Sequence, residues 1–409
     1  PALRRKEIVA ALDPLPCDVQ TMPGLADMLE NGDLVDSLKP VSLDDLLGRT
    51  AVDLDVPDIA KAYAGRTVLI TGAGGSIGSE LCRQMLHCRA RRIILFDHSE
   101  YALYRIDREI RPLAQLAGVE VATVLGSITS SARVTWALQE YDVEIVLHAA
   151  AYKHVPLVEA NELAGTRNNV QGTQILADAA RSAGVERFIL ISTDKAVRPT
   201  NIMGATKRIA EMVIQDLQTR SDKTRFAMVR FGNVLDSSGS VIPLFREQIA
   251  AGGPVTLTHK DVNRFFMTVP EAARLVLLAG SYADGGDVFV LDMGKPVKIA
   301  DLARQMIELS GRTVRNAQNP DGDIEIAVTG LRPGEKLYEE LLIGGDTLAT
   351  PHPKILRAQE AFPSQIEMAA LLRELIQAIE QQNPEKVRQV IIRWVEGYEE
   401  PLPRLQAAD

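Results

Sequence analysis

Short apolar runs recur along most of the chain, separated by segments of helical periodicity. The runs lie at residues 68–70, 93–96, 119–125, 145–150, 188–191, 226–229 and 287–291. Uninterrupted apolar strands that alternate with helices are typical of a parallel sheet covered by helices on both faces. The pattern therefore predicts an α/β fold in which a doubly wound parallel sheet begins near Arg66.

The regular alternation does not extend over the whole chain. Beyond the sixth predicted strand, loops, short strands and helices interleave, which predicts a smaller α/β lobe for substrate at residues 236–345. A return strand to the large sheet is expected within it, near residues 287–291. Residues 346–409 are predicted to form a C-terminal helical segment, with amphipathic helices at 371–381 and 384–396.

Residues 1–60 follow a different pattern. They predict helices at 4–12 and 22–31, a strand at 17–22 and a helix N-cap at Ser42. So short a segment cannot bury a core of its own. We interpret it as the remnant of a preceding domain plus a linker, and the chain, which starts at Pro1, as a fragment of a longer protein.

Composition narrows the class of protein. Apolar residues make up 46% and charged residues 24% of the chain, as in ordinary soluble globular proteins. The net charge of −9 argues against a nucleic-acid partner, which would select a basic surface. The cysteines form no CxxC pair and the histidines lack ligand spacing, so we expect reduced thiols and no metal site. No apolar run approaches the ~20 residues that span a bilayer.

A glycine-rich turn follows the first predicted strand. Residues 71–78 have the sequence TGAGGSIG, in which Gly72, Gly75 and Gly78 permit a tight turn close to a pyrophosphate. The helix that follows offers free N–H groups and the positive end of its dipole. Because a strand precedes the turn and a helix follows it, residues 61–235 are predicted to form a Rossmann domain that binds a nicotinamide cofactor.

Asp97 ends the second predicted strand, 19 residues after Gly78. A carboxylate at this position accepts hydrogen bonds from the adenosine ribose and repels a 2′-phosphate. The sequence therefore favours NAD, with NADP the weaker candidate. The structural alternative is that Asp97 merely caps the next helix.

The fifth predicted strand is followed by Thr193, Asp194 and Lys195. In a doubly wound sheet the carboxyl ends of the strands face the ligand, so a hydroxyl, a carboxyl and an amine in succession predict a catalytic site there. The alternative is a solvent-exposed salt bridge. Lys207 follows in a segment that is predicted to be helical.

With these residues in place, the chain resembles the extended short-chain dehydrogenase/reductase superfamily. Within it, the chain is most similar to the membrane-anchored, retaining bacterial UDP-N-acetylglucosamine 4,6-dehydratases of polysaccharide biosynthesis. The resemblance covers residues 40–345 and is carried by TGAGGSIG at 71–78, HAAAYKHVP at 148–156, STDKAV at 192–197, RFGNV at 230–234, residues 237–245, and LRPGEK at 331–336.

The resemblance implies binding residues by position in these motifs. Those expected at the cofactor are Gly72, Gly75, Ser76, Ile77, Gly78, Asp97, Ser99, Ile128, Ala149, Ala150, Ala151, Lys207, Phe231 and Asn233. Those expected at the nucleotide sugar are Lys153, His154, Asn233, Arg264, Arg332 and Glu335. The two arginines are candidates to clamp the diphosphate, since guanidinium groups bind phosphate in a bidentate manner. Alternatives are surface charges for the arginines and a hydrogen-bonded core histidine for His154.

Two positions depart from the superfamily pattern. Met203 stands where the usual catalytic tyrosine precedes Lys207 by four residues, and a thioether cannot take a proton. Either the enzyme is inactive or another group replaces the tyrosine. The anchored dehydratases characteristically lack that tyrosine, which favours replacement. Ser127 stands where relatives often carry an aspartate near the adenine, which affects only that contact.

The resemblance implies a redox-neutral reaction. Hydride leaves C4, a base removes the C5 proton, an acid helps the C6 hydroxyl leave as water, and hydride returns at C6. Lys195 is expected to be the base and Asp194 the acid, with Thr193 at the C4 oxygen and Lys207 at the nicotinamide ribose. A lysine base must be partly neutral, so we expect burial or Lys207 to lower the pKa of Lys195.

Several alternatives remain open at this point. An inverting dehydratase or a 4-epimerase is the enzymatic rival, and a non-catalytic nucleotide-sugar sensor or scaffold is the rival of another class. The resemblance further implies a membrane-anchored parent protein at the cytoplasmic face of the bacterial inner membrane, a soluble fragment, and a homo-oligomer. A UDP-sugar is the expected partner.

Overall fold

A computed structural model of the chain describes residues 57–235, 237, 239–342 and 347–399, together with Ile8, Gln20–Thr21 and Lys39–Pro40. Gln20–Thr21 (β1) pairs with Lys39–Pro40 (β2) in antiparallel fashion. Apart from Ile8, which is helical, the helices predicted at 4–12 and 22–31 lie outside the described residues, as do most of the strand at 17–22 and the N-cap at Ser42.

The chain divides into two compact units. The larger contains Asp53–Val234, Val269–Gly294 and Pro333–Asp409, and the smaller contains Pro1–Val52, Leu235–Thr268 and Lys295–Arg332. This division differs from the boundaries expected from sequence patterns. Residues 269–294 join the larger unit because they supply a strand to its sheet, and the C-terminal helices join it because they pack on its surface.

Among the described residues, nine strands form one sheet in the larger unit, in the order β17-β18-β13-β8-β7-β6-β3-β4-β5. The strands are β3 (Thr67–Thr71), β4 (Arg92–Asp97), β5 (Glu120–Leu125), β6 (Ile145–His148), β7 (Arg187–Ile191), β8 (Arg225–Arg230), β13 (Asp287–Leu291), β17 (Thr347–Ala349) and β18 (Ile355–Ala358). Strands β3 to β8 and β13 are parallel, as predicted. The order reverses between β3 and β6, where doubly wound sheets bind ligands.

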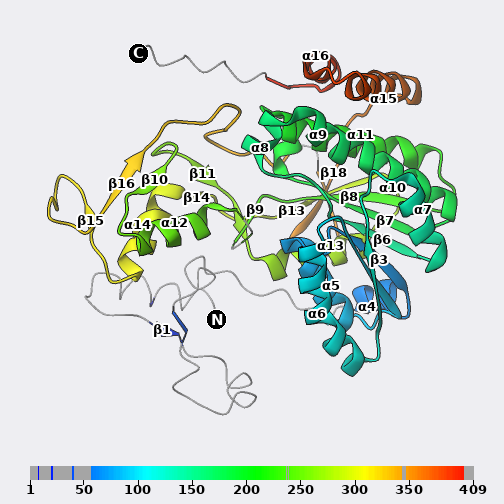
Figure 1. Ribbon diagram of the computed structural model, residues 1–409, viewed down its shortest axis with the longest axis horizontal. Coiled ribbons are helices and arrows are strands. Elements are labelled where there is room, and N and C mark those ends of the chain that lie inside the picture. Colours follow the sequence, from blue (N-terminus) through cyan, green and yellow to red (C-terminus); the bar gives the residue numbers. More distant parts are fainter. Residues whose placement is uncertain are drawn as a thin grey trace. The chain divides into compact units, whose positions relative to one another are not determined.

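Helices cover both faces of this sheet (Figure 1). One face carries α4 (Pro57–Tyr63), α5 (Ser76–His87), α6 (Glu100–Ala117) and α13 (Val269–Ser281). The other carries α7 (Ser131–Glu140), α8 (Val155–Ala160), α9 (Glu162–Thr166), a π-helical turn (Arg167–Gln171), α10 (Gly172–Ala183) and α11 (Ile202–Thr219). The doubly wound α/β fold predicted from the apolar runs is confirmed.

Polar side chains set where the helices begin. Asn201 caps α11, because its side-chain oxygen accepts a hydrogen bond from the backbone N–H of Gly204 at 2.8 Å. Ser99 caps α6 through the N–H of Ala102. Ser364 and Glu367 form a reciprocal capping box, which starts α15 (Gln365–Glu380) six residues before the predicted start.

The C-terminal segment completes the larger unit. Strands β17 and β18, which the apolar pattern did not predict, extend the sheet beyond β13 in antiparallel fashion. Helices α15 and α16 (Pro384–Trp394) pack against α9 and α11. Helix α11 is consequently buried along residues 202–217, even at polar positions.

The smaller unit has short elements. Strands β10 (Val255–Leu257), β16 (Ile324–Val328) and β15 (Val314–Arg315) form a parallel sheet in the order β10-β16-β15. Strands β11 (Asn263–Arg264) and β14 (Val297–Lys298) pair in antiparallel fashion. The other elements of this unit are β12 (Phe266–Met267), α12 (Val241–Ala250) and α14 (Ile299–Leu309).

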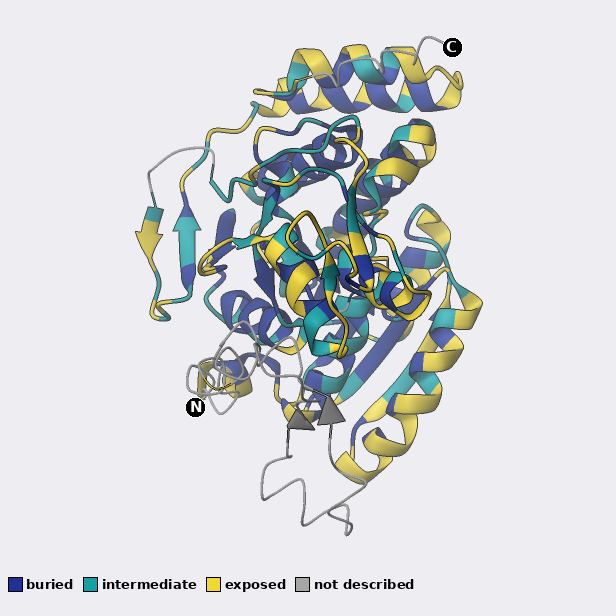
Figure 2. Cartoon of the chain, turned by 90° about the vertical axis from the view of Figure 1, so that its left-hand side faces the viewer, coloured by how far each residue is buried: buried dark blue, intermediate teal, exposed yellow. Residues whose placement is uncertain are grey.

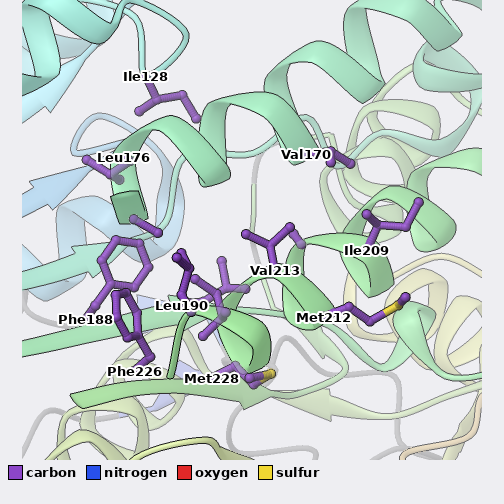
Figure 3. Close-up of a cluster of buried hydrophobic side chains, with 14 of the residues drawn as sticks. Ile128, Val170, Leu176, Phe188, Leu190, Ile209, Met212, Val213, Phe226 and Met228 are labelled. Carbon is purple, nitrogen blue, oxygen red and sulfur yellow. The ribbon is translucent and has the colours of Figure 1, made fainter. Parts of the chain in front are cut away.

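The hydrophobic core of the larger unit lies between the sheet and the helices. Figure 2 shows the inner strands of the sheet buried and the outer faces of many helices exposed. On the side of α10 and α11, Phe188, Leu190, Phe226 and Met228 from the strands pack with helix residues such as Val213 (Figure 3).

A four-residue ionic cluster is embedded beside this core. It consists of Arg230 on β8, Arg208 and Glu211 on α11, and Glu360 after β18, and we call it the structural cluster. Arg230 bonds Glu211 at 2.6 Å and Glu360 at 2.5 Å, with no exposed side-chain surface of its own. The cluster therefore ties the C-terminal segment to the sheet.

Candidate active site

The glycine-rich turn forms as predicted between β3 and α5. Gly72 has a φ of +64°, in the left-handed region that favours glycine. A Cβ at Gly78 would overlap the carbonyl oxygen of Gly72, so the turn could not close around any larger residue. Ser76 and Ile77 open α5 and are partly exposed, which leaves the helix N-terminus accessible to an anion.

Asp97 links this turn to the next helix. Its Oδ2 accepts a hydrogen bond from the N–H of Gly74 at 2.9 Å, and its Oδ1 accepts one from the N–H of Ser99 at 2.9 Å. Asp97 therefore fixes the start of α6, as the structural alternative to ribose binding proposed. Each carboxylate oxygen has a second lone pair, so a ribose contact is compatible with these bonds.

The other predicted cofactor residues lie at neighbouring strand ends. Ala149, Ala150 and Ala151 follow β6, and the N–H of Ala150 donates to Thr71 Oγ1 at 3.3 Å. Phe231 is buried immediately after β8. Ile128 is buried in the hydrophobic core, and its contact with the cofactor stays a prediction. The sheet thus gathers these residues along the carboxyl ends of adjacent strands β4, β3, β6, β7 and β8.

The chain turns sharply after β7 and places three functional groups together. Asp194–Ala196 form a 3₁₀ turn that Thr193 caps. The Thr193 hydroxyl donates to Asp194 Oδ1 at 2.9 Å, and the N–H of Asp194 donates to the carbonyl of Phe231 at 3.1 Å. The backbone of Asp194 is thus held against the end of β8, and the Thr193 hydroxyl orients its carboxyl group.

Lys195 lies at the centre of a polar cluster, which we call the active-site cluster and which comprises Asp194, Lys195, Asn233 and Glu339. Lys195 Nζ is 3.1 Å from Asp194 Oδ1, 3.1 Å from Asn233 Oδ1 and 2.8 Å from Glu339 Oε1. Asn233 Nδ2 donates to Glu339 Oε2 at 2.9 Å. The alternative of a solvent-exposed salt bridge does not hold, because the side chains of Asp194 and Glu339 are 0% and 5% exposed.

The charges in this cluster set its proton state. Burial raises the pKa of Asp194, Lys195 lowers it, and the charge and hydrogen bond of Glu339 raise it again, to about 7. Burial by itself would lower the pKa of Lys195, but Asp194 and Glu339 together raise it above its usual value. Our expectation of a lowered Lys195 pKa is therefore wrong, because two carboxyl groups stabilise the ammonium ion.

Lys207, not Lys195, has the lowered pKa. Its ammonium group is buried and donates to the carbonyl of Ile191 at 2.7 Å. Burial lowers its pKa to about 8, although Glu211 opposes this. Met203, one turn earlier on α11, is only 2% exposed and belongs to the hydrophobic core. The position of the usual tyrosine is thus filled by an apolar side chain.

Two predicted sugar residues follow β6. Lys153 is exposed, but desolvation and the charge of Lys195 lower its pKa. Burial and Lys153 lower the pKa of His154, which is half-buried just before α8. The core histidine is instead His148, which bonds the Thr71 and Thr173 hydroxyls at 2.7 and 2.9 Å. Burial lowers its pKa to about 3.

The remaining predicted residues are divided between the two units. Glu335 is partly exposed in the larger unit. Arg264 and Arg332 belong to the smaller unit, where Arg264 Nη1 donates to the carbonyl of Asn263 at 2.8 Å. The roles of all three toward a nucleotide sugar stay predictions. Within the described ranges, no group of His, Cys, Asp or Glu side chains could hold a metal ion.

Sequence reasoning missed Glu339. It lies three residues after Lys336, the last residue of the LRPGEK motif, in a segment without regular structure. Lys336 Nζ donates to the carbonyl of Val197 at 3.1 Å, and Thr200 Oγ1 donates to the carbonyl of Gly334 at 2.8 Å. These contacts hold the segment against the turn that carries Lys195. The signal that could have pointed to an acidic residue here is that a buried lysine needs a counter-ion.

The fold and the strand-end residues define a Rossmann-fold protein of the short-chain dehydrogenase/reductase type. Residues 68–360 match the family described as polysaccharide biosynthesis protein, and the chain belongs to this family.

Individual relatives agree with this assignment. The chain is 52% identical over 323 residues to the capsular polysaccharide biosynthesis protein CapD of Staphylococcus aureus, covering 78% of this chain and 52% of CapD. It therefore spans about half the length of that relative. It is 30% identical over 293 residues to an inverting UDP-N-acetylglucosamine 4,6-dehydratase of Campylobacter jejuni, covering 70% of this chain and 80% of that protein.

A solved structure supports the fold. Pen from Bacillus thuringiensis superimposes with a TM-score of 0.64 at 32% sequence identity, covering 75% of this chain and 91% of that one. In the part of the chain that the structure describes, no helix is long and apolar enough to cross a membrane.

Proposed function

We propose that this chain is the catalytic part of an NAD-dependent UDP-N-acetylglucosamine 4,6-dehydratase that serves bacterial surface polysaccharide biosynthesis. The observation that carries the proposal is the pairing of Asp194 with Lys195 at the carboxyl end of β7. The pKa of Asp194 is raised to about 7, so this carboxyl can donate a proton at neutral pH. The dehydratase relative from Campylobacter jejuni supports the same reaction class.

The residues of the turn fit NAD. Gly72 and Gly78 leave room for the backbone to approach a pyrophosphate, and the N-terminus of α5 would bind it. Asp97 lies at the end of β4, where its charge favours NAD over NADP. When bound, NAD would supply an acceptor for the C4 hydride and a donor of hydride to C6.

The side chains of the active-site cluster supply the proton transfers. Lys195 takes the C5 proton, which a ketone at C4 acidifies, and Asp194 donates a proton to the departing C6 hydroxyl. Thr193 bonds the C4 oxygen. Lys207, whose pKa is lowered to about 8, contacts the nicotinamide ribose and stabilises negative charge at that oxygen. Met203 takes no part in proton transfer.

The nucleotide sugar requires further contacts. Lys153 and His154 are proposed to line the sugar site, since they follow β6 beside Lys195. Arg264 and Arg332 are proposed to bind the diphosphate, and Glu335 the uridine ribose. For the whole protein we propose a membrane-anchored homo-oligomer at the cytoplasmic face of the bacterial inner membrane.

A 4-epimerase is the nearest rival. Epimerisation at C4 needs no acid at C6, so a carboxyl group whose pKa lies near 7 beside a lysine favours dehydration. Retention of configuration at C5, rather than inversion, is proposed from the resemblance to the anchored enzymes. A non-catalytic sensor would not need a buried carboxyl group that can donate a proton near neutral pH.

The test is incubation of the purified chain with NAD and UDP-N-acetylglucosamine in deuterated water, followed by NMR. We expect a 4-keto-6-deoxy sugar with deuterium at C5, and with retention its spectrum should differ from that of the diastereomer that the inverting relative produces. Asp194→Asn should abolish product while leaving nucleotide-sugar binding intact. Substrate that is bound but unchanged would favour the sensor, and a C4 epimer with hydrogen at C5 would favour the epimerase.

A further inference from the structure

We infer that Glu339 accepts the proton that Lys195 must lose, so that the base at C5 is a Lys195–Glu339 pair and not Lys195 alone. The inference rests on the proposed function and deepens it. Glu339 acts through Lys195, which makes it a positioning residue that also stores a proton.

The contacts of Lys195 fit an ammonium ion, which has no lone pair with which to take a proton. An ammonium group has three N–H donors, and Asp194, Asn233 and Glu339 each provide one acceptor within 3.1 Å. All three donors are therefore engaged, and Lys195 can bind a C5 proton only after one of its own has moved to a neighbour. Asn233 offers an amide oxygen, which is too weakly basic to accept it.

Of the two carboxyl groups, Glu339 is the better acceptor. Its Oε1 is 2.8 Å from Lys195 Nζ, against 3.1 Å for Asp194 Oδ1. Asp194 must hold its own proton to act as the acid at C6, and its raised pKa matches that state. Asn233 donates to Glu339 Oε2 at 2.9 Å, which turns Oε1 toward the lysine.

The proton movements then balance. Lys195 passes a proton to Glu339, so an N–H bond breaks and an O–H bond forms. The neutral amine takes the C5 proton, the C5–C6 double bond forms, and the C6–O bond breaks as Asp194 protonates the leaving hydroxyl to give water. Glu339 finally returns its proton to Asp194, to which it is hydrogen-bonded. The site is restored, with one proton moved from C5 to water.

The adjacent residue provides a matched control. Glu340 pairs with Arg198 at 2.8 Å, and its side chain is 42% exposed, against 5% for Glu339. Glu340→Gln removes the same charge from the same segment without touching Lys195. Any effect that is specific to Glu339→Gln therefore comes from the active-site cluster.

The first readout is turnover of UDP-N-acetylglucosamine by Glu339→Gln, Glu339→Asp and Glu340→Gln. Glu339→Gln should lower kcat about 100-fold or more, the usual size of a lost acid–base contribution, with KM within about threefold. Glu339→Asp keeps the carboxylate, so its kcat should be at least about tenfold higher than that of Glu339→Gln. Glu340→Gln should match the parent chain.

The second readout needs no turnover. Carbon-13 NMR of labelled aspartate, with Asp194→Asn for assignment, gives the pH midpoint of the Asp194 carboxyl. Removal of the Glu339 charge should move this midpoint down by about one unit or more in Glu339→Gln and leave it in place in Glu340→Gln. The alkaline limb of the kcat profile should move in the same direction.

The outcomes separate the two proposals. If the parent chain makes product and Glu339→Gln keeps its kcat and Asp194 midpoint, the inference is overturned and the proposed function stands. Equal losses in Glu339→Asp and Glu339→Gln with an unmoved midpoint also overturn it, because they describe a merely structural residue. If the parent chain makes no product, the proposed function fails, and the inference fails with it as a statement about a C5 base.

Discussion

Two ionic clusters in the larger unit use similar side chains to opposite effect. The structural cluster pairs Arg230 and Arg208 with Glu211 and Glu360, so two positive charges meet two negative ones. In the active-site cluster a single lysine meets the carboxyl groups of Asp194 and Glu339. Both lie at the carboxyl ends of β7 and β8, and both are largely buried.

Their proton states differ because of this charge balance. Burial by itself would raise the pKa of Glu211, but Arg230, Arg208 and the hydroxyl of Ser192 lower it to about 2. Arg230 is held charged in the same way, since the two glutamates raise its pKa. In the active-site cluster Asp194 and Glu339 share Lys195, and burial together with the charge and hydrogen bond of Glu339 raises the pKa of Asp194 to about 7, although Lys195 opposes this.

Buried ionic clusters can therefore serve two purposes, structural stability and proton transfer. Matched charges stay fixed across the whole physiological pH range, and their hydrogen bonds hold segments together. A cluster in which two carboxyl groups share one lysine retains a proton near neutrality, and that proton can be transferred.

Breaking the matched cluster should have the largest effect on stability. Arg230→Leu leaves two buried glutamates without their main counter-ion, and we expect the free energy of unfolding to fall by about 3–5 kcal/mol. Urea denaturation followed by circular dichroism measures the change. A loss below about 1 kcal/mol would mean that the cluster behaves like a surface salt bridge.

The spacing between α11 and the catalytic turn should matter next. A Cβ at Gly204 would overlap the carbonyl oxygen of Lys195, so Gly204→Ala must push the turn away from the helix. We expect a loss of about 1–3 kcal/mol in stability and a fall in kcat of at least about tenfold. Thermal unfolding and turnover assays of one preparation compare the two. Unchanged kcat would show that the position of Lys195 is not critical.

Lys207 on α11 bonds the carbonyl of Ile191 at the end of β7. It provides a test of how stability depends on pH. Its pKa in the folded protein is lowered to about 8, so the unfolded chain binds more protons above that pH. Stability of the parent chain should therefore rise, relative to Lys207→Met, by about 1–2 kcal/mol between about pH 8 and pH 10. Parallel urea titrations at several pH values measure the difference. If the stability difference between the parent chain and Lys207→Met stays constant or falls as the pH rises, the lowered pKa of Lys207 is contradicted.

Exposed pairs should have the smallest effect. Arg111 and Asp107 are one turn apart on α6, and the Arg111 side chain is 52% exposed. Arg111→Ala should change the free energy of unfolding by no more than about 0.5 kcal/mol. The same urea assay applies. A loss as large as that of Arg230→Leu would mean that burial is not what distinguishes the structural cluster.

Much of the larger unit could be predicted from the sequence because parallel strands are buried on both faces. The apolar runs at β3, β4, β6, β7, β8 and β13 were visible for this reason, as was the glycine turn that follows β3. Strands β17 and β18 were not predicted because they are short and partly exposed at the sheet edge. Their pairing depends on tertiary contacts that local patterns do not contain.

The candidate site was predictable only where its residues share one motif. Thr193, Asp194 and Lys195 are adjacent in sequence, and their place after a buried strand located them. Glu339 is more than a hundred residues away from Lys195, so no local pattern joins the two. The direction of the Lys195 pKa shift was mispredicted for the same reason, since it depends on how many carboxyl groups surround the amine.

The most direct test of the contrast between the clusters is the titration of Asp194 in the parent chain. Carbon-13 NMR of the labelled aspartates, compared with the Asp194→Asn spectrum, follows this single carboxyl group through neutral pH. We predict a midpoint at about pH 7. A midpoint below about pH 5, close to that of an ordinary aspartate, would mean that Asp194 is a fixed counter-ion of Lys195 and carries no proton to transfer.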